Sequence, residues 1–225
     1  MSLWVKICGN TSLADAQLAA DAGADAVGFV FATSPRRVTV EAAAAIYGKL
    51  PRTIEKIGVF VDAGLDEIYS TVRQAGLTGV QLHFEADAQL PAKLRERLGP
   101  DLRILRVVHF DATTADAIAG QIQKLAQDPH VNGLLIDSRT TAAVGGTGVA
   151  FDWAEARRTV FAASHDLKLI AAGGLSPENV AEAITLLRPW GVDVVSGVEA
   201  APGRKDPLKV RAFVERARAT QLALL

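Results

Sequence analysis

Eight short runs of β-branched and other apolar residues, each followed by a stretch with helical spacing, restrict the folds that this chain can adopt. The expected strands are Leu3–Cys8, Asp25–Phe31, Ile54–Val61, Gly79–His83, Leu102–Val108, Gly133–Asp137, Leu167–Ala171 and Val192–Ser196. Regular alternation of strand and helix is typical of parallel sheets, because each helix carries the chain back to the start of the next strand. The sequence therefore predicts an α/β architecture with parallel strands.

The stretches between these runs have the apolar spacing of amphipathic helices. The expected helices are Ser12–Ala22, Val40–Leu50, Leu65–Ala75, Ala88–Leu98, Thr113–Gln127, Pro177–Leu187 and Pro207–Ala219. Ser12 is a suitable N-cap for the first helix, and Gly23 is suited to end it. No linker or low-complexity segment interrupts the series, so we expect residues 1–225 to form a single domain.

Eight strand–helix units in 225 residues favour a compact (β/α)8 TIM barrel. A doubly wound open sheet is the alternative, but it usually has fewer strands and a G-x-G-x-x-G turn after the first of them. Here the first strand instead runs into K-I-C-G-N-T. In a barrel, the loops after the C-terminal ends of the strands form the active face, so functional residues are expected there.

Composition narrows the possible partners. The 24 basic and 25 acidic residues give a formal charge of −1, which lacks the positive field that attracts nucleic acid or an anionic membrane. The chain has no signal-peptide pattern and no window of roughly 18 uninterrupted apolar residues, so we expect a cytoplasmic protein. One cysteine and four scattered histidines provide neither an internal disulfide nor a recognisable zinc site. We expect a small-molecule partner and no metal.

The expected strand ends supply a short set of candidate functional residues, namely Cys8, Arg36, Arg37, His83 and Asp137. Each also has a purely structural interpretation: Cys8 as a small buried hydrophobe, Arg36 and Arg37 as a solvated pair, His83 as a core histidine and Asp137 as the cap of a turn. The position of Asp137 favours function, because partial burial raises the pKa of a carboxyl group toward that of a useful acid. Two neighbouring arginines at a strand end can likewise clamp a carboxylate.

Cys8 is the only cysteine in the chain. Side chains alternate along a strand, so Lys6 and Cys8 share one face and Ile7 takes the other. An isoleucine belongs against the helices, which turns Lys6 and Cys8 toward the barrel interior. A thiol with a pKa of about 8.5 is only slightly ionised at neutral pH, and a nearby ammonium increases that fraction. The pair therefore indicates a base.

Small residues dominate the loops expected after the last three strands. They are Gly145, Gly146, Thr147 and Gly148 after the sixth, Gly173 and Gly174 after the seventh, and Ser196 and Gly197 after the eighth. Such residues let backbone N–H groups approach an anion closely, and barrels often bind phosphate above strands seven and eight. One glycine pair alone would indicate only a tight turn, whereas three neighbouring loops of this kind indicate a phosphate site.

An ordered set of motifs resembles one known family. The motifs are K-I-C-G-N-T, D-A-V-G-F-V-F-A-T-S-P-R-R, V-Q-L-H, L-L-I-D, G-G-T-G-V-A-F-D-W, A-G-G-L-S-P-E-N-V and V-D-V-V-S-G-V-E-A-A-P-G-R-K-D. Together they are similar to those of the phosphoribosylanthranilate isomerases of tryptophan biosynthesis, from Val5 to about Pro207. The glycine motifs are shared by many phosphate-binding barrels, but the ordered set is specific.

The resemblance implies an Amadori rearrangement without cofactor or metal. N-(5-phosphoribosyl)anthranilate would become 1-(2-carboxyphenylamino)-1-deoxyribulose 5-phosphate, with Asp137 as the general acid and Cys8 as the general base. Arg37 falls on the family's arginine for the anthranilate carboxylate, with Arg36 as the backup assignment, His83 falls in the substrate site, and the small-residue loops fall on the phosphate loops. The family includes monomers and dimers, so a monomer or homodimer is expected.

Two positions depart from the family pattern: Phe84 follows His83 where glycine is common, and Val149 stands where a lysine often follows G-G-T-G. The rival enzymes are the histidine-pathway isomerase of the same chemistry and a metal-dependent phosphosugar epimerase. The first has a two-fold repeat and an aspartate in place of Cys8, and the second has metal-ligating strand ends. A non-catalytic phosphometabolite-binding barrel or a scaffold subunit is a further alternative, but a dead copy would be expected to have lost Cys8 or Asp137.

Overall fold

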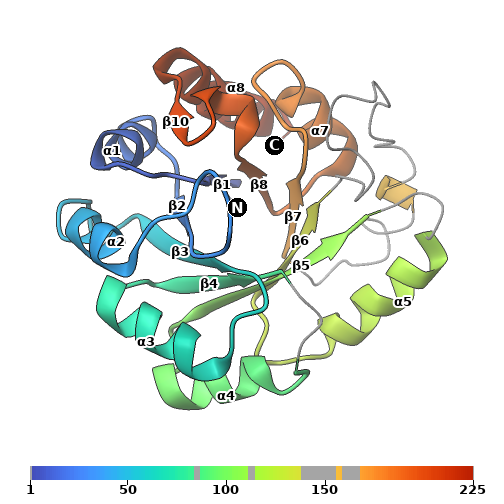
Figure 1. Ribbon diagram of the computed structural model, residues 1–225. Coiled ribbons are helices and arrows are strands. Elements are labelled where there is room, and N and C mark those ends of the chain that lie inside the picture. The colour runs from blue at the N-terminus through green and yellow to red at the C-terminus, as the bar shows by residue number, and fades with distance from the viewer. Residues whose placement is uncertain (1, 84–86, 111–114, 138–155, 159–167, 225) are drawn as a thin grey trace.

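Eight parallel strands close into a barrel in the computed structural model, which describes residues 2–83, 87–110, 115–137, 156–158 and 168–224. The strands are β1 (Trp4–Ile7), β2 (Ala26–Val30), β3 (Glu55–Phe60), β4 (Gly79–Leu82), β5 (Arg103–His109), β6 (Gly133–Asp137), β7 (Leu169–Ala172) and β8 (Gly191–Val194). Each pairs in parallel with its neighbours, and β1 pairs with β8 to complete the ring. The predicted (β/α)8 TIM barrel is confirmed (Figure 1).

Helices surround the strands on the outside of the barrel (Figure 1). In the described ranges they are α1 (Leu13–Asp21), α2 (Val40–Tyr47), α3 (Leu65–Ala75), α4 (Leu90–Leu98), α5 (Ala115–Ala126), α7 (Val180–Leu187) and α8 (Pro207–Ala223). The Ser12 hydroxyl accepts a hydrogen bond from the Asp15 amide at 3.2 Å, and Gly23 follows with a φ of +89°, so both predicted ends of α1 are confirmed. None of these described helices is long and apolar enough to cross a membrane.

The chain after β8 differs from the prediction. The strand ends at Val194, and a short 3-10 turn, Ser196–Val198, leads into a hairpin formed by β9 (Glu199–Ala201) and β10 (Arg204–Lys205). The predicted start of α7 is also shifted to Val180, because the preceding residues form a turn in which the Asn179 side chain accepts from the Ser176 amide at 2.8 Å. Of these two differences, the β9–β10 hairpin bears on the candidate site, because it packs beside the C-terminal end of β1.

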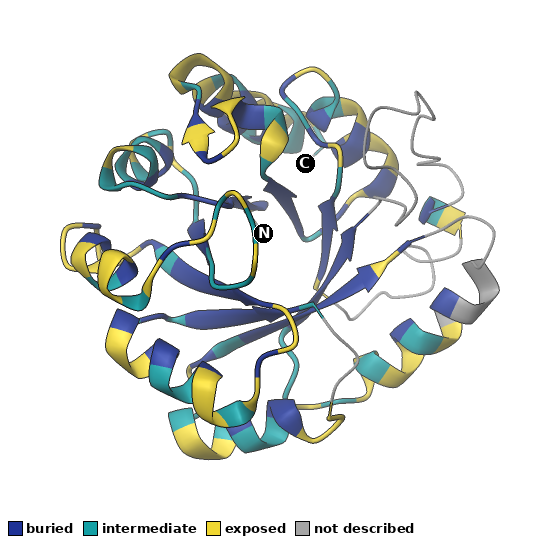
Figure 2. Cartoon of the chain, in the orientation of Figure 1, coloured by how far each residue is buried: buried dark blue, intermediate teal, exposed yellow. Residues whose placement is uncertain are grey.

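Apolar side chains occupy two separate regions. The larger lies between strands and helices and contains Val5 and Ile7 together with helix residues such as Phe213. The smaller contains Trp4, Leu135 and other strand residues inside the barrel. Alternation along each strand supplies both regions, and Figure 2 shows buried residues along the strands and exposed ones on the outer helix faces. The predicted orientation, with Ile7 toward the helices, is confirmed.

Candidate active site

A cavity of about 240 Å³ is lined by residues at the C-terminal ends of the strands and in the loops that follow them. Seven of the residues predicted from the sequence line it: Cys8, Arg36, His83, Asp137, Gly173, Gly174 and Ser196. Gln81 and Asp193 line it as well, although the sequence did not single them out. Strand ends from distant parts of the chain therefore line one cavity, and the role of these residues in binding and catalysis stays a prediction.

Cys8 lies just beyond β1, and its amide donates to the Val194 carbonyl at 2.9 Å. The residue is 3% exposed and faces the cavity. The neighbouring residue on β2 is Gly28, where an added Cβ would lie 2.4 Å from the Cys8 sulfur. Glycine at this point of β2 therefore provides the space that the thiol occupies, because no real Cβ approaches a sulfur atom so closely.

A buried polar network lies one layer below Cys8 inside the barrel. The Lys6 ammonium donates to Gln81 Oε1 at 2.8 Å and to Asp193 Oδ1 at 2.9 Å. Since an ammonium can only donate, Gln81 must present its oxygen to Lys6 and its amide nitrogen to His83 Nε2, which lies 2.8 Å away. This bond requires an unprotonated Nε2, so His83 carries its proton on Nδ1 in this arrangement.

Opposing effects act on the pKa of Cys8. Burial raises the pKa of the thiol above its ordinary value of 9.0, whereas the positive charge of Lys6 lowers it, and burial prevails. The sequence correctly indicated the ammonium, but burial outweighs its effect. Burial lowers the pKa of the Lys6 ammonium, but Asp193 and Cys8 together outweigh burial and raise that pKa, so the ammonium stays charged.

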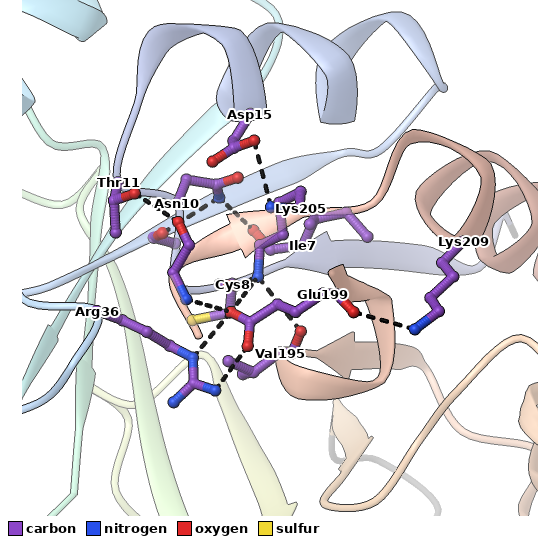
Figure 3. Close-up of polar contacts among 12 residues, drawn as sticks. Ile7, Cys8, Asn10, Thr11, Asp15, Arg36, Val195, Glu199, Lys205 and Lys209 are labelled. Atoms are coloured by element: carbon purple, nitrogen blue, oxygen red, sulfur yellow. Dashed lines mark hydrogen bonds and ion pairs between the residues drawn. The ribbon is translucent and has the colours of Figure 1, made fainter. Parts of the chain in front are cut away.

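A second charged cluster reaches Cys8 from the β9–β10 hairpin (Figure 3). The Lys205 ammonium donates to the Cys8 carbonyl oxygen at 2.6 Å and to Glu199 Oε1 at 3.1 Å. The Glu199 carboxylate also accepts from Arg36 Nε at 2.8 Å and from Arg36 Nη2 at 2.6 Å. Sequence reasoning missed Glu199 and Lys205, although the Pro-Gly pair between E-A-A and R-K is a turn signal that could have indicated the hairpin.

The two predicted arginines occupy different places. Arg36 lines the cavity, and its hydrogen bond to Glu199 raises the pKa of the guanidinium. Arg37 is exposed and lines a separate surface depression with residues of α2 and α3. The structure thus brings Arg36 together with Cys8, while Arg37 lies one residue further along the same loop.

Gly173 and Gly174 have φ angles of +79° and +65°, a left-handed conformation that favours glycine, and both line the cavity beside Ser196. At Gly197 an added Cβ would lie 1.9 Å from the Leu175 carbonyl oxygen, so this glycine allows the loops after β7 and β8 to pack closely, and its part in phosphate binding stays a prediction. Gly145, Gly146, Thr147 and Gly148 lie outside the described residues, as do Phe84 and Val149.

Asp137 is the last residue of β6, is 5% exposed and lines the same cavity as Cys8. A carboxyl group and a thiol therefore face one cavity from different sides of the barrel. Within the described ranges, no group of three or more His, Cys, Asp or Glu residues is arranged to hold a metal ion. The arrangement can perform proton transfer at a small ligand that carries anionic groups.

Known proteins are similar to this chain in both sequence and fold. Residues 5–216 match the family model described as N-(5'phosphoribosyl)anthranilate (PRA) isomerase. The N-(5'-phosphoribosyl)anthranilate isomerase of Geotalea uraniireducens is 43% identical over 215 residues, which cover 95% of this chain and 98% of the relative. The crystal structure of phosphoribosyl anthranilate isomerase from Thermotoga maritima has a TM-score of 0.81 and 34% identity, and the match covers 96% of this chain and 99% of that one.

A further crystal structure holds a ligand. It is a phosphoribosyl anthranilate isomerase in complex with reduced 1-(o-carboxyphenylamino)-1-deoxyribulose 5-phosphate, with a TM-score of 0.78 and 33% identity. The match covers 96% of this chain and 99% of that one. The family model and the relatives match nearly the whole sequence, and the solved structures share the barrel. This chain therefore belongs to the N-(5'-phosphoribosyl)anthranilate isomerase family.

Proposed function

We propose that this protein catalyses the Amadori rearrangement of N-(5-phosphoribosyl)anthranilate to 1-(2-carboxyphenylamino)-1-deoxyribulose 5-phosphate in tryptophan biosynthesis. The observation that carries the proposal is that Cys8 and Asp137 line one cavity in a member of this isomerase family. A reduced form of the same product is bound by one solved relative. We further propose that residues 1–225 act as one catalytic domain, since the family match spans most of them.

Asp137 is the proposed general acid. Its carboxyl group donates a proton to the furanose ring oxygen, the bond between that oxygen and C1 breaks, and C1 becomes an iminium carbon conjugated with the anthranilate nitrogen. An ether oxygen is only weakly basic, so its protonation needs an acid held close to it in a site that excludes bulk water. The burial of Asp137 at the end of β6 supports this role.

Cys8 is the proposed general base. Its thiolate removes the proton from C2, the C2–H electron pair forms a C1–C2 double bond, and the iminium electrons return to nitrogen. The resulting enolamine then tautomerises to the ketone, with a proton added at C1. The adjacent iminium makes the C2 proton acidic, so a base of modest strength suffices. The thiol lines the cavity, and burial raises its pKa above the ordinary 9.0.

Anionic groups at the two ends of the substrate call for separate contacts. We assign the phosphate to backbone N–H groups of the loops at Gly173, Gly174 and Ser196, which line the cavity. We assign the anthranilate carboxylate to Arg37, with Arg36 as the alternative. Arg36 already lies in the cavity, but Glu199 engages its guanidinium with two hydrogen bonds and offsets its charge.

The acid–base assignment is tested with wild type, Cys8→Ser and Asp137→Asn in an assay that follows the loss of anthranilate fluorescence from substrate generated in situ. Wild type is expected to consume the substrate, and each variant to lose about a hundredfold or more in kcat, the usual contribution of such groups. Calorimetric titration with the reduced product provides the control, because both variants should still bind it. Turnover in both variants within a few-fold of wild type would remove these residues from the mechanism.

Two further results of the same assay separate the remaining possibilities. A wild-type protein that binds the reduced product but never converts substrate would be a phosphometabolite-binding barrel, and the isomerase proposal would be wrong. Arg37→Ala is expected to raise KM with little change in kcat, because a contact made equally in substrate and transition state affects binding alone. The same rise in Arg36→Ala, with no effect of Arg37→Ala, would assign the carboxylate to Arg36.

A further inference from the structure

The ammonium of Lys205 joins three segments at the base of the candidate site. Besides the Cys8 carbonyl and Glu199, it donates to the Val195 carbonyl oxygen at 3.3 Å, so that each of its three protons has an acceptor. The side chain is fully buried, and the three acceptors come from the end of β1, the loop after β8 and the start of β9. Figure 3 shows this ammonium beside the Cys8 backbone.

Glu199 holds this lysine and the cavity arginine at once. Its carboxylate accepts from both side chains and, at 3.3 Å, from the Gly203 amide in the hairpin turn. Two cations share one carboxylate, so the cluster as a whole carries net positive charge next to Cys8. The hydrogen bonds from Arg36 and the charge of Lys205 hold the pKa of Glu199 below its usual value despite burial, so the carboxylate stays ionised.

From this arrangement we propose that Lys205 is a positioning residue for Cys8: its ammonium fixes the Cys8 carbonyl at the end of β1, and its charge favours the thiolate. Glu199 holds the ammonium in place. The proposal rests on the proposed function, in which Cys8 is the general base. It assigns the β9–β10 hairpin a part in the reaction, because the hairpin carries both residues of the ion pair.

Several charged groups act on the thiol together, and Lys205 is one of them. Those that face Cys8 from the surrounding elements are Lys6, Arg36, Asp193, Glu199 and Lys205, with His83 and Asp137 lining the same cavity. Burial raises the pKa of the thiol, Lys6 and Lys205 lower it, and Asp193 raises it. Burial also lowers the pKa of Lys205 itself, and Glu199 opposes that change. Removal of the Lys205 charge should therefore leave burial less opposed at Cys8.

The rate of alkylation by iodoacetamide measures this effect directly, because Cys8 is the only thiol in the chain. The rate is followed by mass spectrometry between about pH 7 and about pH 10, where alkylation is proportional to the thiolate fraction. Lys205→Met is expected to react roughly three- to tenfold more slowly than wild type at a given pH, with its profile displaced to higher pH. Lys205→Arg, which keeps the charge, should restore most of the rate.

Lys209→Met is the matched control. Lys209 is exposed and donates to the Glu199 carbonyl oxygen at 3.0 Å from the outer side of the hairpin, so its loss should leave the alkylation profile unchanged. If Lys205→Met does not fold, as judged by circular dichroism, Lys205→Gln replaces it, because the amide can still donate to the Cys8 carbonyl but carries no charge. The proposal is overturned if a folded Lys205 variant that lacks the charge is alkylated as fast as wild type or faster. A faster reaction would mean that the substitution only loosens the site and exposes the thiol.

Turnover distinguishes failure of this inference from failure of the proposed function. With phosphoribosylanthranilate, Lys205→Met should lose kcat by about tenfold or more with KM nearly unchanged, because the lysine acts on the base and not on the substrate. If Lys205→Met is alkylated more slowly than wild type but wild type converts no substrate, the effect of Lys205 on Cys8 is upheld and the isomerase function is rejected. If wild type is active and Lys205→Met matches it in both alkylation and turnover, the isomerase function is upheld and the role of Lys205 is rejected.

Discussion

Cys8 acquires its chemical environment from residues that are distant in the sequence. Gly28 leaves room for its sulfur, Lys6 and Asp193 place opposite charges below it, and Lys205 binds its carbonyl oxygen. At the residue scale, therefore, the thiol depends on steric space as much as on charge. The pKa of the thiol is raised because burial exceeds the opposing influence of the ammonium groups.

The steric requirement at β2 leads to a prediction for Gly28→Ala. The new methyl group would lie 2.4 Å from the Cys8 sulfur, so the thiol must move. Displacement of a catalytic group by about 1 Å can cost roughly a hundredfold in rate, and we expect kcat to fall by roughly ten- to a hundredfold. Steady-state kinetics on the substrate generated in situ measures the change.

Gly120→Ala is the control for this substitution. An added Cβ at Gly120 meets no atom within 4 Å, and the residue lies in α5, outside the barrel. It should leave kcat unchanged and slightly stabilise the helix, because alanine favours helix by up to about 1 kcal/mol over glycine. Equal activity in the two variants would show that the space beside Cys8 is not required.

At the scale of elements, long regular segments were predictable and short irregular ones were not. The first helix has its predicted N-cap Ser12 and terminal Gly23, because capping depends on residues close together in the chain. The β9–β10 hairpin, in contrast, has strands of only three and two residues, too short for an alternating pattern to be recognised. The contacts of this hairpin are long-range: Lys205 donates to the Cys8 carbonyl just beyond β1, and Glu199 accepts from Arg36 in the loop after β2.

The Glu199 carboxylate leads to a prediction about acid stability. Its pKa is held below the ordinary 4.5 in the folded protein, so its contribution to stability is present above that value and is lost as the pH falls through the lower folded pKa. Glu199→Gln should therefore be less stable than wild type at neutral pH, with the two converging as the pH falls below 4.5. Urea unfolding at a series of pH values measures this difference.

A constant gap between the two unfolding curves at all pH values would contradict that explanation, because it would mean that the charge of Glu199 does not matter. Asp66→Asn serves as the control. Asp66 is an exposed residue of α3 that pairs with Arg97 at 2.5 Å near the surface. Exposed pairs of this kind contribute little, so this variant should follow wild type throughout the pH range.

For the molecule as a whole, the two ends of the sequence meet where the barrel closes. β1 pairs with β8, and Arg218 on α8 donates to the Leu3 carbonyl, to the Gly23 carbonyl at 2.8 Å and to Asp25 Oδ2 at 2.8 Å. One guanidinium thus ties the last helix to the residue before the first strand and to the turn before the second. The oligomeric state, monomer or homodimer, stays a prediction that analytical ultracentrifugation would decide.

Arg218→Ala should lower the free energy of unfolding by about 1–2 kcal/mol, because partly exposed hydrogen bonds to a charged group make a moderate contribution. Urea denaturation followed by circular dichroism measures the change. Arg211→Ala, an exposed arginine on the same helix, should change the free energy by less than about 0.5 kcal/mol. Equal effects of the two substitutions would argue against a role of Arg218 in closing the barrel.

The amino-acid sequence by itself determined the alternation of strands and helices, the outward face of β1, and the placement of Cys8 and Asp137 at strand ends. These features follow from short-range periodicity, which each segment carries independently of the rest. Only the tertiary structure decided that Lys205 meets Cys8 across 197 positions of sequence and that Arg36 shares a carboxylate with it. It also decided the direction of the Cys8 pKa, because burial exists only after the barrel has closed.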